Sequence, residues 1–461
     1  LPTESLRKLD SVFVQFSPME LFLEKLSLAL AQQLPSSEKV ACYGVAFSGG
    51  LDSSVLLTGL ARLNHMPVRA LHVNHGLHPD SNQWEDHCRS VAVSLGVDFE
   101  SLRVSIKPRP GQSLEAQART IRYQALESML WPNELLLTAH HAEDQLETIL
   151  LRLLRGSGVK GLRGIASFRR FGVHYMARPM LEMTRNEIHS QAKTWGIVYV
   201  DDPSNLDLRF DRNYLRSAIV PQLLSRWPGS PTTVGRAARQ MVDAQLILDE
   251  VAREEADNLD FFPRIPVKKI LALPQPKQRN FMRYLLANLD LPLPNFRQLE
   301  TLLQSLAVER PDAMTQVKWP GSEARIYRNH LYLFSPLSAP SGPDYVGLIA
   351  ANRPWKGPEG TLVLEQVEGK GLPSSWANNG LTVSFRVGGE RFRPAGAKHS
   401  RSLKKLLQDA GVVPWMRSRI PLLFRDEEIV AVGDLWLSNQ IDEYPEEPSW
   451  RVRWTDHPLF F

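Results

Sequence analysis

The 461-residue sequence predicts an α/β fold: a parallel, Rossmann-like sheet in the first part of the chain, then a helical domain and a small α+β domain. Short apolar runs alternate with helical patterns in the first part, an order typical of a parallel sheet covered by helices. Two stretches rich in Pro, Gly and Ser, at 226–233 and 336–343, are typical of domain boundaries. We therefore expect domains at 1–228, 232–337 and 344–461.

The first domain begins with an N-terminal extension, 1–35, in which Glu20–Leu34 has apolar residues at helical spacing and is expected to cover the sheet. Strands are expected next at Val40–Phe47, Val68–Val73, Val97–Ile106 and Glu134–Ala139. Helices between and after them are expected at Asp52–Leu63, Trp84–Leu95, Ser113–Leu130 and Ala142–Leu154. Parallel sheets of this kind bind ligands at the carboxyl ends of their strands.

The two later domains carry different patterns. The middle domain is expected to be mostly helical, with helices at Val234–Asp257, Gln278–Leu289 and Asn295–Leu306. The last domain has strand patterns at Leu381–Phe385 and Ile429–Val432 around a helix near Ser402–Asp409, which indicates a small α+β fold.

The composition excludes several classes of protein. Apolar residues make up 43% of the chain and charged residues 23%, as in ordinary globular proteins. No apolar run approaches the roughly 20 residues that a membrane span needs, and the N-terminus lacks a signal-peptide pattern. Two cysteines, Cys42 and Cys88, are too few for a disulfide framework or a four-cysteine metal site. We expect a cytoplasmic protein without a membrane partner.

The strongest motif lies between the first expected strand and the first helix after it. Ser48, Gly49, Gly50, Leu51, Asp52 and Ser53 follow one another there. The glycines allow a tight turn whose N–H groups, with the helix N-terminus behind them, form an anion site. The serine hydroxyls can donate to phosphate oxygens, and Asp52 can hold Mg²⁺. A turn that needs glycine only for its positive φ is the simpler alternative.

A second group of polar residues begins at the end of the fourth expected strand, in Thr138–Thr148. His140 and His141 lie at the mouth of the sheet, and Asp144 and Glu147 are spaced to share one helix face. Such a density of titratable groups indicates an active site, whereas a helix cap with surface acids is the alternative.

The first motif resembles the pyrophosphate loop of the N-type ATP pyrophosphatases, and the chain has no Walker A pattern, GxxxxGK[ST]. Together with Thr138–Thr148 and His72–His78, it is similar to the tRNA(Ile)-lysidine synthetase family. Further matches in family order are Glu115–Arg119, Arg122–Tyr123, Gly156–Gly164, Arg178–Pro179, Asp202–Asn205, Arg212–Arg216 and Pro221. The two later domains resemble the family's RNA-binding domains less distinctively, and the N-terminal extension departs from the family pattern.

The resemblance implies an enzyme that uses ATP and Mg²⁺ to modify the wobble cytidine of an isoleucine tRNA with a CAU anticodon. ATP would adenylate the oxygen on carbon 2 of the cytidine ring. The amine of free L-lysine would then displace AMP, giving lysidine, AMP and pyrophosphate. The family also implies a homodimer.

The resemblance and the residue chemistry together give the candidate site. The candidate ATP-binding residues are Ser48–Ser53 with His72 and Asn74. Asp52 is a candidate Mg²⁺ ligand, and Asp144 is a candidate for a second Mg²⁺ ligand or for orienting the lysine ammonium. The catalytic candidates are Asp144, His140, Glu147 and Arg119. Asp144, Glu147 and His140 all remain candidates for taking the proton from lysine, which attacks only as a neutral amine. Arg119 and Arg212 are candidates for stabilising phosphate or adenylate charge, with buried ion pairing as the alternative.

The charge is uneven behind a net value of +4. Residues 381–425, here called the basic block, hold ten Lys and Arg against two acids, a net charge of +8, and 426–461 have a net charge of −7 from two Arg and nine acids. The block interleaves Phe385, Phe392 and Trp415, which predicts a surface for phosphates and stacked bases; a solvated face is the alternative. The candidate tRNA-binding residues are Arg212, Arg216, Arg401, Lys404 and Lys405.

Several weaker signals are discounted. Gly156–Gly161 fits GxGxxG but follows a helix, so a flexible loop near the active site is expected, with basic neighbours able to reach RNA. The histidines of His72–His78 lack the cysteines or carboxylates of a zinc site. Sulfur transfer would need paired cysteines, an ammonia-using synthetase would not need two basic appended domains, and a non-catalytic RNA-binding protein would not need an intact Ser48–Ser53 loop.

Overall fold

The structure, a computed structural model, divides into two compact units, residues 1–248 and 249–461. It describes residues 18–34, 38–106, 114–201, 207–257, 264–308, 314–342, 346–443 and 448–457. The units divide inside α10 (Ser230–Asp257), whereas the sequence analysis places a boundary in the Pro- and Gly-rich stretch before that helix. Pro231 lies in the first turn of α10, where a helix tolerates proline, so this stretch begins a helix.

The first unit is built on a six-stranded sheet in the order β3-β2-β1-β4-β6-β5. Its strands are β1 (Cys42–Ala46), β2 (Val68–Asn74), β3 (Asp98–Arg103), β4 (Glu134–Leu137), β5 (Phe168–Phe171) and β6 (His174–Ala177). Neighbouring strands are parallel except β5, which pairs antiparallel with β6. The predicted parallel α/β fold is confirmed, with the β5–β6 hairpin as an unpredicted edge.

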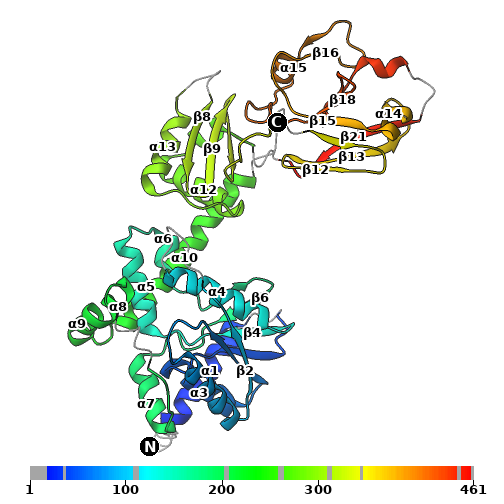
Figure 1. Cartoon of the computed structure of the whole chain (residues 1–461). Helices are drawn as coiled ribbons and strands as arrows, with labels where there is room; N and C mark the ends of the chain where they lie inside the picture. Colours follow the sequence, from blue (N-terminus) through cyan, green and yellow to red (C-terminus); the bar gives the residue numbers. More distant parts are fainter. Residues whose placement is uncertain are drawn as a thin grey trace, which may run out of the picture. The chain divides into compact units, whose positions relative to one another are not determined.

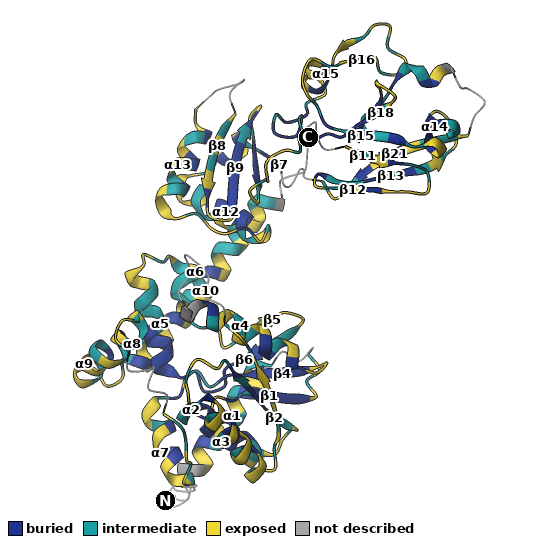
Figure 2. Ribbon diagram, in the orientation of Figure 1, coloured by how far each residue is buried: buried dark blue, intermediate teal, exposed yellow. Residues whose placement is uncertain are grey.

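Helices cover both faces of this sheet (Figure 1). They are α1 (Pro18–Gln33), α2 (Leu51–Leu63), α3 (Ser81–Ser94), α4 (Leu114–Met129), α5 (Ala142–Leu154), α6 (Val159–Leu162), α7 (Arg185–Trp195), α8 (Asp211–Tyr214), the π-helix Leu215–Ile219 and α9 (Val220–Arg226). Helix α1 confirms the covering helix expected in the N-terminal extension, because Phe22, Leu26 and Leu30 are buried in the core beside α2 (Figure 2). The motif Asp202–Asn205 lies outside the described residues.

The second unit contains an antiparallel sheet that the sequence analysis did not predict, in addition to the expected helices. The helices are α11 (Val267–Leu271), α12 (Gln275–Asn288) and α13 (Phe296–Leu306). The strands β7 (Arg264–Pro266), β8 (Thr315–Trp319), β9 (Ser322–Tyr327) and β10 (His330–Phe334) pair in the order β7-β10-β9-β8. Arg328 and Asn329, both with positive φ, form the two-residue turn between β9 and β10. This turn lacks the Gly that marks most such hairpins in a sequence.

The end of the chain forms two further sheets, and the predicted small α+β fold is confirmed. The first, in the order β11-β15-β18-β19-β20, contains β11 (Gly347–Ile349), β15 (Leu381–Ser384), β18 (Leu422–Arg425), β19 (Glu428–Val432) and β20 (Trp436–Leu437). The second, in the order β12-β13-β21-β14, contains β12 (Trp355–Gly357), β13 (Gly360–Val367), β14 (Leu372–Pro373) and β21 (Ser449–Thr455). The remaining elements are the β16 (Arg391–Phe392) and β17 (Arg401–Ser402) pair, α14 (Ser374–Asn379), α15 (Leu403–Asp409) and the 3₁₀ helix Asn439–Glu443. No helix of the described residues is long and apolar enough to span a bilayer.

The aromatic residues of the basic block are core residues, so the predicted stacking surface is wrong. Phe385, Phe392 and Trp415 are 1%, 3% and 8% exposed. The Trp415 ring packs edge-on against Tyr332, with 5.1 Å between centroids. Burial of large rings removes much apolar surface from water, and this gain outweighs the local pattern of charges around them.

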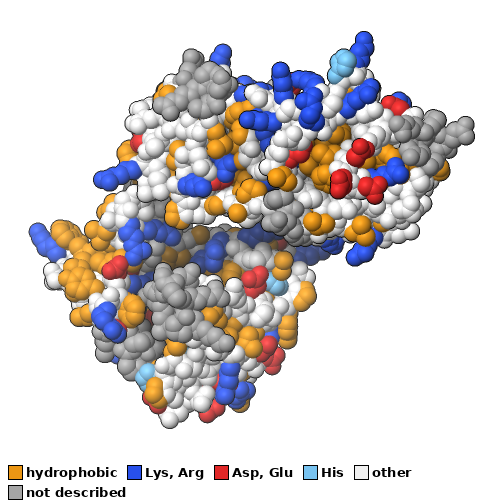
Figure 3. All heavy atoms as spheres, turned by 45° about the horizontal axis from the view of Figure 1, so that its top comes forward, with side chains coloured by type: hydrophobic (Ala, Val, Ile, Leu, Met, Phe, Trp, Pro, Cys, Tyr) orange, Lys and Arg blue, Asp and Glu red, His pale blue; other side chains and the backbone are white. Residues whose placement is uncertain are grey.

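The basic block is divided between structural and exposed cations. Arg419 is buried and pairs with buried Glu359 at 2.8 Å, and Glu359 also accepts a hydrogen bond from the Ser341 backbone N–H. Lys404 and Lys405, on α15, are exposed. Figure 3 shows Lys and Arg side chains gathered on the surface of the second unit.

Candidate active site

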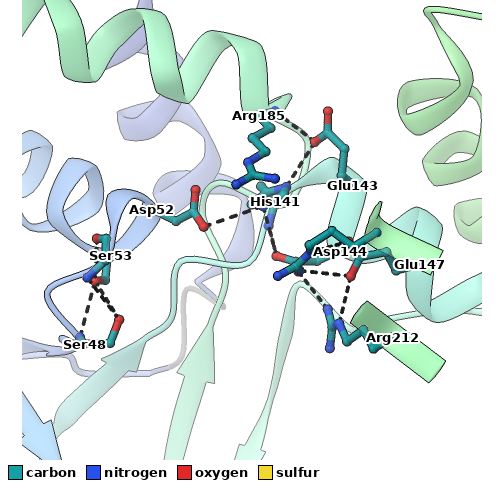
Figure 4. Close-up of polar contacts among 11 residues, drawn as sticks. Ser48, Asp52, Ser53, His141, Glu143, Asp144, Glu147, Arg185 and Arg212 are labelled. Carbon is teal, nitrogen blue, oxygen red and sulfur yellow. Dashed lines mark hydrogen bonds and ion pairs between the residues drawn. The ribbon is translucent and has the colours of Figure 1, made fainter. Parts of the chain in front are cut away.

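The loop between β1 and α2 is folded as an anion site requires. Gly49 has φ +79°, and a Cβ added there would lie 2.8 Å from the Cys88 sulfur. The Ser48 and Ser53 hydroxyls lie 3.1 Å apart (Figure 4). The Ser53 hydroxyl also donates to the Gly50 carbonyl. No side chain caps the N-terminus of α2, so its first N–H groups point at the loop without a side-chain acceptor.

Replacing Gly49 by alanine is expected to raise the KM for ATP about tenfold, because a positive φ costs about 1–2 kcal/mol and the new methyl group must displace the Cys88 side chain. Steady-state kinetics with varied ATP measure the effect. Gly96→Ala is the matched control: Gly96 has φ +65° and no atom within 4 Å of the position that a Cβ would take, so it tests backbone strain alone. If the KM for ATP were the same in both variants, the shape of the Ser48–Ser53 loop would not matter for ATP binding.

His141 lies between the loop and α5, in contact with acids on both sides (Figure 4). Its Nε2 is 3.7 Å from an Asp52 oxygen and 3.5 Å from an Asp144 oxygen, and its Nδ1 is 3.0 Å from Glu143. Burial would lower the pKa of His141, but Asp144, Glu143 and Asp52 outweigh it and raise the pKa. Burial raises the pKa of Asp52 against the opposing effect of His141. The imidazole therefore joins the loop carboxylate to the α5 carboxylate.

Two arginines complete the cluster around α5. Arg212 donates to Asp144 at 2.7 Å and to Glu147 at 2.8 Å. Arg216 donates to the same two carboxylates at 2.9 and 2.7 Å. Burial would raise the pKa of Asp144, but His141 and the arginines hold it well below its usual range. The structure thus pairs Arg212 with Asp144 and Glu147, the ion-pairing alternative given for it in the sequence analysis, and it places Arg216, a tRNA-binding candidate, against the same two carboxylates.

The other catalytic candidates lie around this cluster. Burial lowers the pKa of His140 to about 3, so its ring is neutral at neutral pH, and its Nδ1 lies 2.9 Å from the Thr138 hydroxyl. Glu147 is 1% exposed and holds both arginines. Arg119 is exposed on α4 and contacts the Tyr123 hydroxyl at 3.4 Å. Among the ion pairs of the described residues, none joins Arg119 to these carboxylates, although its charge helps to lower the pKa of His140.

The two ATP-binding candidates on β2 are buried supports of the site. His72 Nδ1 lies 2.9 Å from the Phe47 carbonyl, just before the loop. Asn74 donates to Glu85 at 2.8 Å and accepts from the Gly76 N–H at 3.0 Å, which fixes the turn after β2. These contacts fix the carboxyl end of β2 beside the Ser48–Ser53 loop.

Sequence reasoning missed the role of Glu143 as a support of the cluster. One Glu143 oxygen contacts His141 Nδ1 and accepts the Arg185 backbone N–H at 2.9 Å, which ties α5 to the start of α7. Glu143 stands within Thr138–Thr148, so the motif contained the signal, whereas nothing in the sequence connected Arg185 to it. Cys42 and Cys88 are buried, and burial raises their pKa values to about 11 and about 12, so neither is a reactive thiolate.

Comparison with known proteins agrees with this architecture. Family models match a PP-loop domain at residues 23–223, a TilS substrate binding domain at 266–332 and a TilS substrate C-terminal domain at 381–454. The tRNA(Ile)-lysidine synthase of Coxiella burnetii is 36% identical over 88% of this chain and 92% of its own length. That of Alkalilimnicola ehrlichii is 37% identical over 95% of this chain and 98% of its own length.

The chain belongs to the tRNA(Ile)-lysidine synthase family. The predicted resemblance is confirmed, as is the prediction of an ATP-dependent, tRNA-modifying ligase. Among solved structures, the U34-tRNA thiolase NcsA of Methanococcus maripaludis covers 50% of this chain and 80% of its own, at 15% identity and a TM-score of 0.42. The Ser48–Ser53 loop lies within the residues that the PP-loop model matches and is called the PP-loop below.

Proposed function

We propose that this chain joins free L-lysine to carbon 2 of the wobble cytidine of a CAU-anticodon isoleucine tRNA, through an adenylated cytidine, releasing AMP and pyrophosphate. The observation that carries the proposal is the cluster in which His141 links Asp52, beside the PP-loop, to Asp144 on α5. It puts a phosphate site and a cation-binding site next to each other. An adenylating ligase with a cationic second substrate needs both.

The residues fit a bound Mg²⁺ held jointly with ATP. Asp52 Oδ1 is buried and has no hydrogen-bond partner among the described residues. No group of three or more His, Cys, Asp or Glu side chains in the described part of the chain forms a complete metal site. Mg²⁺ commonly takes one or two carboxylates and fills its other positions with phosphate oxygens and water. Asp52, together with Asp144, would hold the ion, which would neutralise phosphate charge.

Lysine would bind at Asp144 and Glu147. The two carboxylates already bind two guanidinium groups, so the site selects for cations and a lysine ammonium can exchange with Arg212 or Arg216. The amine must lose a proton before it attacks. Burial lowers the pKa of His140 to about 3, which makes its imidazole a weak base and leaves the carboxylates of Asp144 and Glu147 as the candidate acceptors.

The test of this proposal is mass analysis of the nucleosides after incubation with ATP, lysine and the CAU isoleucine tRNA. We expect lysidine, with AMP release that depends strictly on both lysine and tRNA. AMP release with ammonia in place of lysine would instead indicate an amide-type synthetase. Sedimentation of the pure chain tests the homodimer that the family resemblance implies.

We further propose that the exposed cations of the basic block bind tRNA phosphates. Reversing Lys404 and Lys405 to Glu is expected to weaken tRNA binding about tenfold and to lower the slope of log Kd against log salt by about 1–2, because two phosphate contacts are lost. Titration of labelled tRNA at several salt concentrations measures both. The matched control reverses Arg353 and Lys356, which are exposed in the same unit but outside the block. Unchanged binding by the first variant would place the tRNA contacts elsewhere; Arg401, which pairs with Asp409, is the next residue to test.

A further inference from the structure

The segment that follows α5, residues 155–170, runs into the first residues of β5 and carries the glycine-rich stretch that was expected from the sequence to be a flexible loop. In the structure it contains the short helix α6 and is held in place by side chains from its neighbours. Helix α5 supplies most of these contacts and also carries Asp144 and Glu147. Figure 1 places α6 beside the C-terminal half of α5.

Gln145 and Arg152 of α5 fix this segment through its backbone. The Gln145 side chain accepts the Ile165 N–H at 2.6 Å and donates to the Ile165 carbonyl at 3.1 Å. Arg152 donates to the carbonyls of Gly161 and Gly164 at 2.7 and 2.6 Å. Gly164 has φ +67°, and a Cβ there would overlap the Gln145 amide, so the fit depends on glycine.

A third anchor comes from the other side of the segment. Arg178 is 4% exposed and donates to the Ala166 carbonyl at 2.6 Å. Side chains therefore bind the segment at four backbone positions, and the Arg178 backbone N–H adds a hydrogen bond to the Ser167 carbonyl. A segment held this tightly presents its outward side chains at a fixed distance from the active-site carboxylates.

The outward side chains are cationic. Arg155, Lys160, Arg169 and Arg170 are exposed and Arg163 is partly exposed, and residues 151–170 contain no acid. Arg155 pairs with Asp211, both at the surface. Within the described part of the chain, neither Lys160 nor Arg163 has an acidic partner in an ion pair. The segment therefore presents fixed positive charge, and at Lys160 and Arg163 no acidic side chain of the described residues pairs with it.

We propose that this segment is the docking site on the catalytic unit for the sugar-phosphate backbone of the substrate RNA, with Lys160 and Arg163 as phosphate ligands and Gln145 and Arg152 as positioning residues. The inference rests on the proposed function. Gln145 follows Asp144 directly, so an RNA backbone held on this segment lies at a set distance from the carboxylates that are proposed to bind lysine. Phosphate contacts supply affinity and fix the register of the RNA, but they do not distinguish one base from another. A rigid cationic segment can make such contacts.

The first experiment measures binding of an anticodon stem-loop RNA to the full chain at several salt concentrations. The Lys160→Glu/Arg163→Glu variant is expected to bind about tenfold more weakly, with a salt slope lower by about 1–2. The matched control, Lys39→Glu/Lys193→Glu, reverses two exposed cations of the same unit outside the segment and is expected to bind within about twofold of wild type. Wild-type affinity and slope in the first variant, or an equal loss in the control, would overturn the inference.

The second experiment separates positioning from general stability. Arg152→Met removes the donors to Gly161 and Gly164, and Arg152→Lys keeps a cation able to donate to both. We expect the Met variant to have a KM for tRNA about tenfold higher than wild type and an unchanged KM for ATP. The Lys variant is expected to have a KM for tRNA close to that of wild type. Equal changes in both KM values, or no rescue by Lys, would show a merely structural role. RNA binding is measured without turnover, so it tests the docking site alone. Failure of the wild-type chain to form lysidine would instead overturn the proposed function.

Discussion

Replacing Asp144 by asparagine is expected to reduce kcat for lysidine formation by about 10³-fold while the fold is retained. Asp144 accepts hydrogen bonds from the His141 backbone N–H at 3.0 Å, from Arg212 and from Arg216. Asparagine keeps the shape but removes the negative charge that both the Mg²⁺ site and the lysine ammonium would use. Mass analysis of nucleosides after single-turnover reactions measures the rate, and circular dichroism checks the fold.

Glu134 offers a matched control for Asp144, because it lies at the start of β4, the strand that precedes α5. Glu134, at the start of β4, is 3% exposed and pairs with buried Arg69 at 2.6 Å. Glu134→Gln removes a comparably buried charge far along the strand from the PP-loop, so it is expected to lower stability by about 3–5 kcal/mol and to leave turnover per folded molecule unchanged. Turnover of Asp144→Asn within about tenfold of wild type would remove Asp144 from the chemistry.

The fold of the first unit was predictable because its local sequence signals agree with its tertiary structure. The apolar spacing and the polar residues at its start both predict a helix at Ala142–Leu154. Helix α5 has the same bounds in the structure. The Ser48–Ser53 loop was found for the same reason: a buried strand, two glycines and a helix occur in succession. These features lie within short stretches of sequence, where periodicity and turn chemistry act.

The parts that were not predicted depend on contacts between distant residues. Arg212 and Arg216 reach Asp144 across more than 60 residues of sequence, with separations of 68 and 72. A cation next to family motifs is equally consistent with RNA binding and with an internal ion pair. Trp415 likewise sits among cations in the sequence but packs on Tyr332 in the core, because burial depends on which elements meet. Sequence spacing alone does not carry that information.

Replacing Asp52 by asparagine is expected to slow adenylation by about 10³-fold, because Asp52 is the carboxylate beside the PP-loop and the proposed ligand of ATP-bound Mg²⁺. Single-turnover release of pyrophosphate from ATP and tRNA in the absence of lysine measures this step alone. The deficit is expected to shrink as Mg²⁺ is raised, since a weakened site is filled by mass action. A deficit that does not respond to Mg²⁺ would assign Asp52 to holding His141 rather than the metal.

Glu147→Gln supplies the complementary comparison. Glu147 contacts Arg212 and Arg216 but, in contrast to Asp52, has no contact with His141 among the ion pairs of the described residues. We expect this variant to release pyrophosphate at close to the wild-type rate and to raise the KM for lysine about 10²-fold, because one of the two carboxylates that bind the ammonium loses its charge. If the two variants impaired the same step equally, the division of the cluster into an ATP side and a lysine side would be wrong. If Asp52→Asn slows only pyrophosphate release and Glu147→Gln weakens only lysine use, the two steps depend on different carboxylates of one cluster. His141, which contacts Asp52 and Asp144, lies between them.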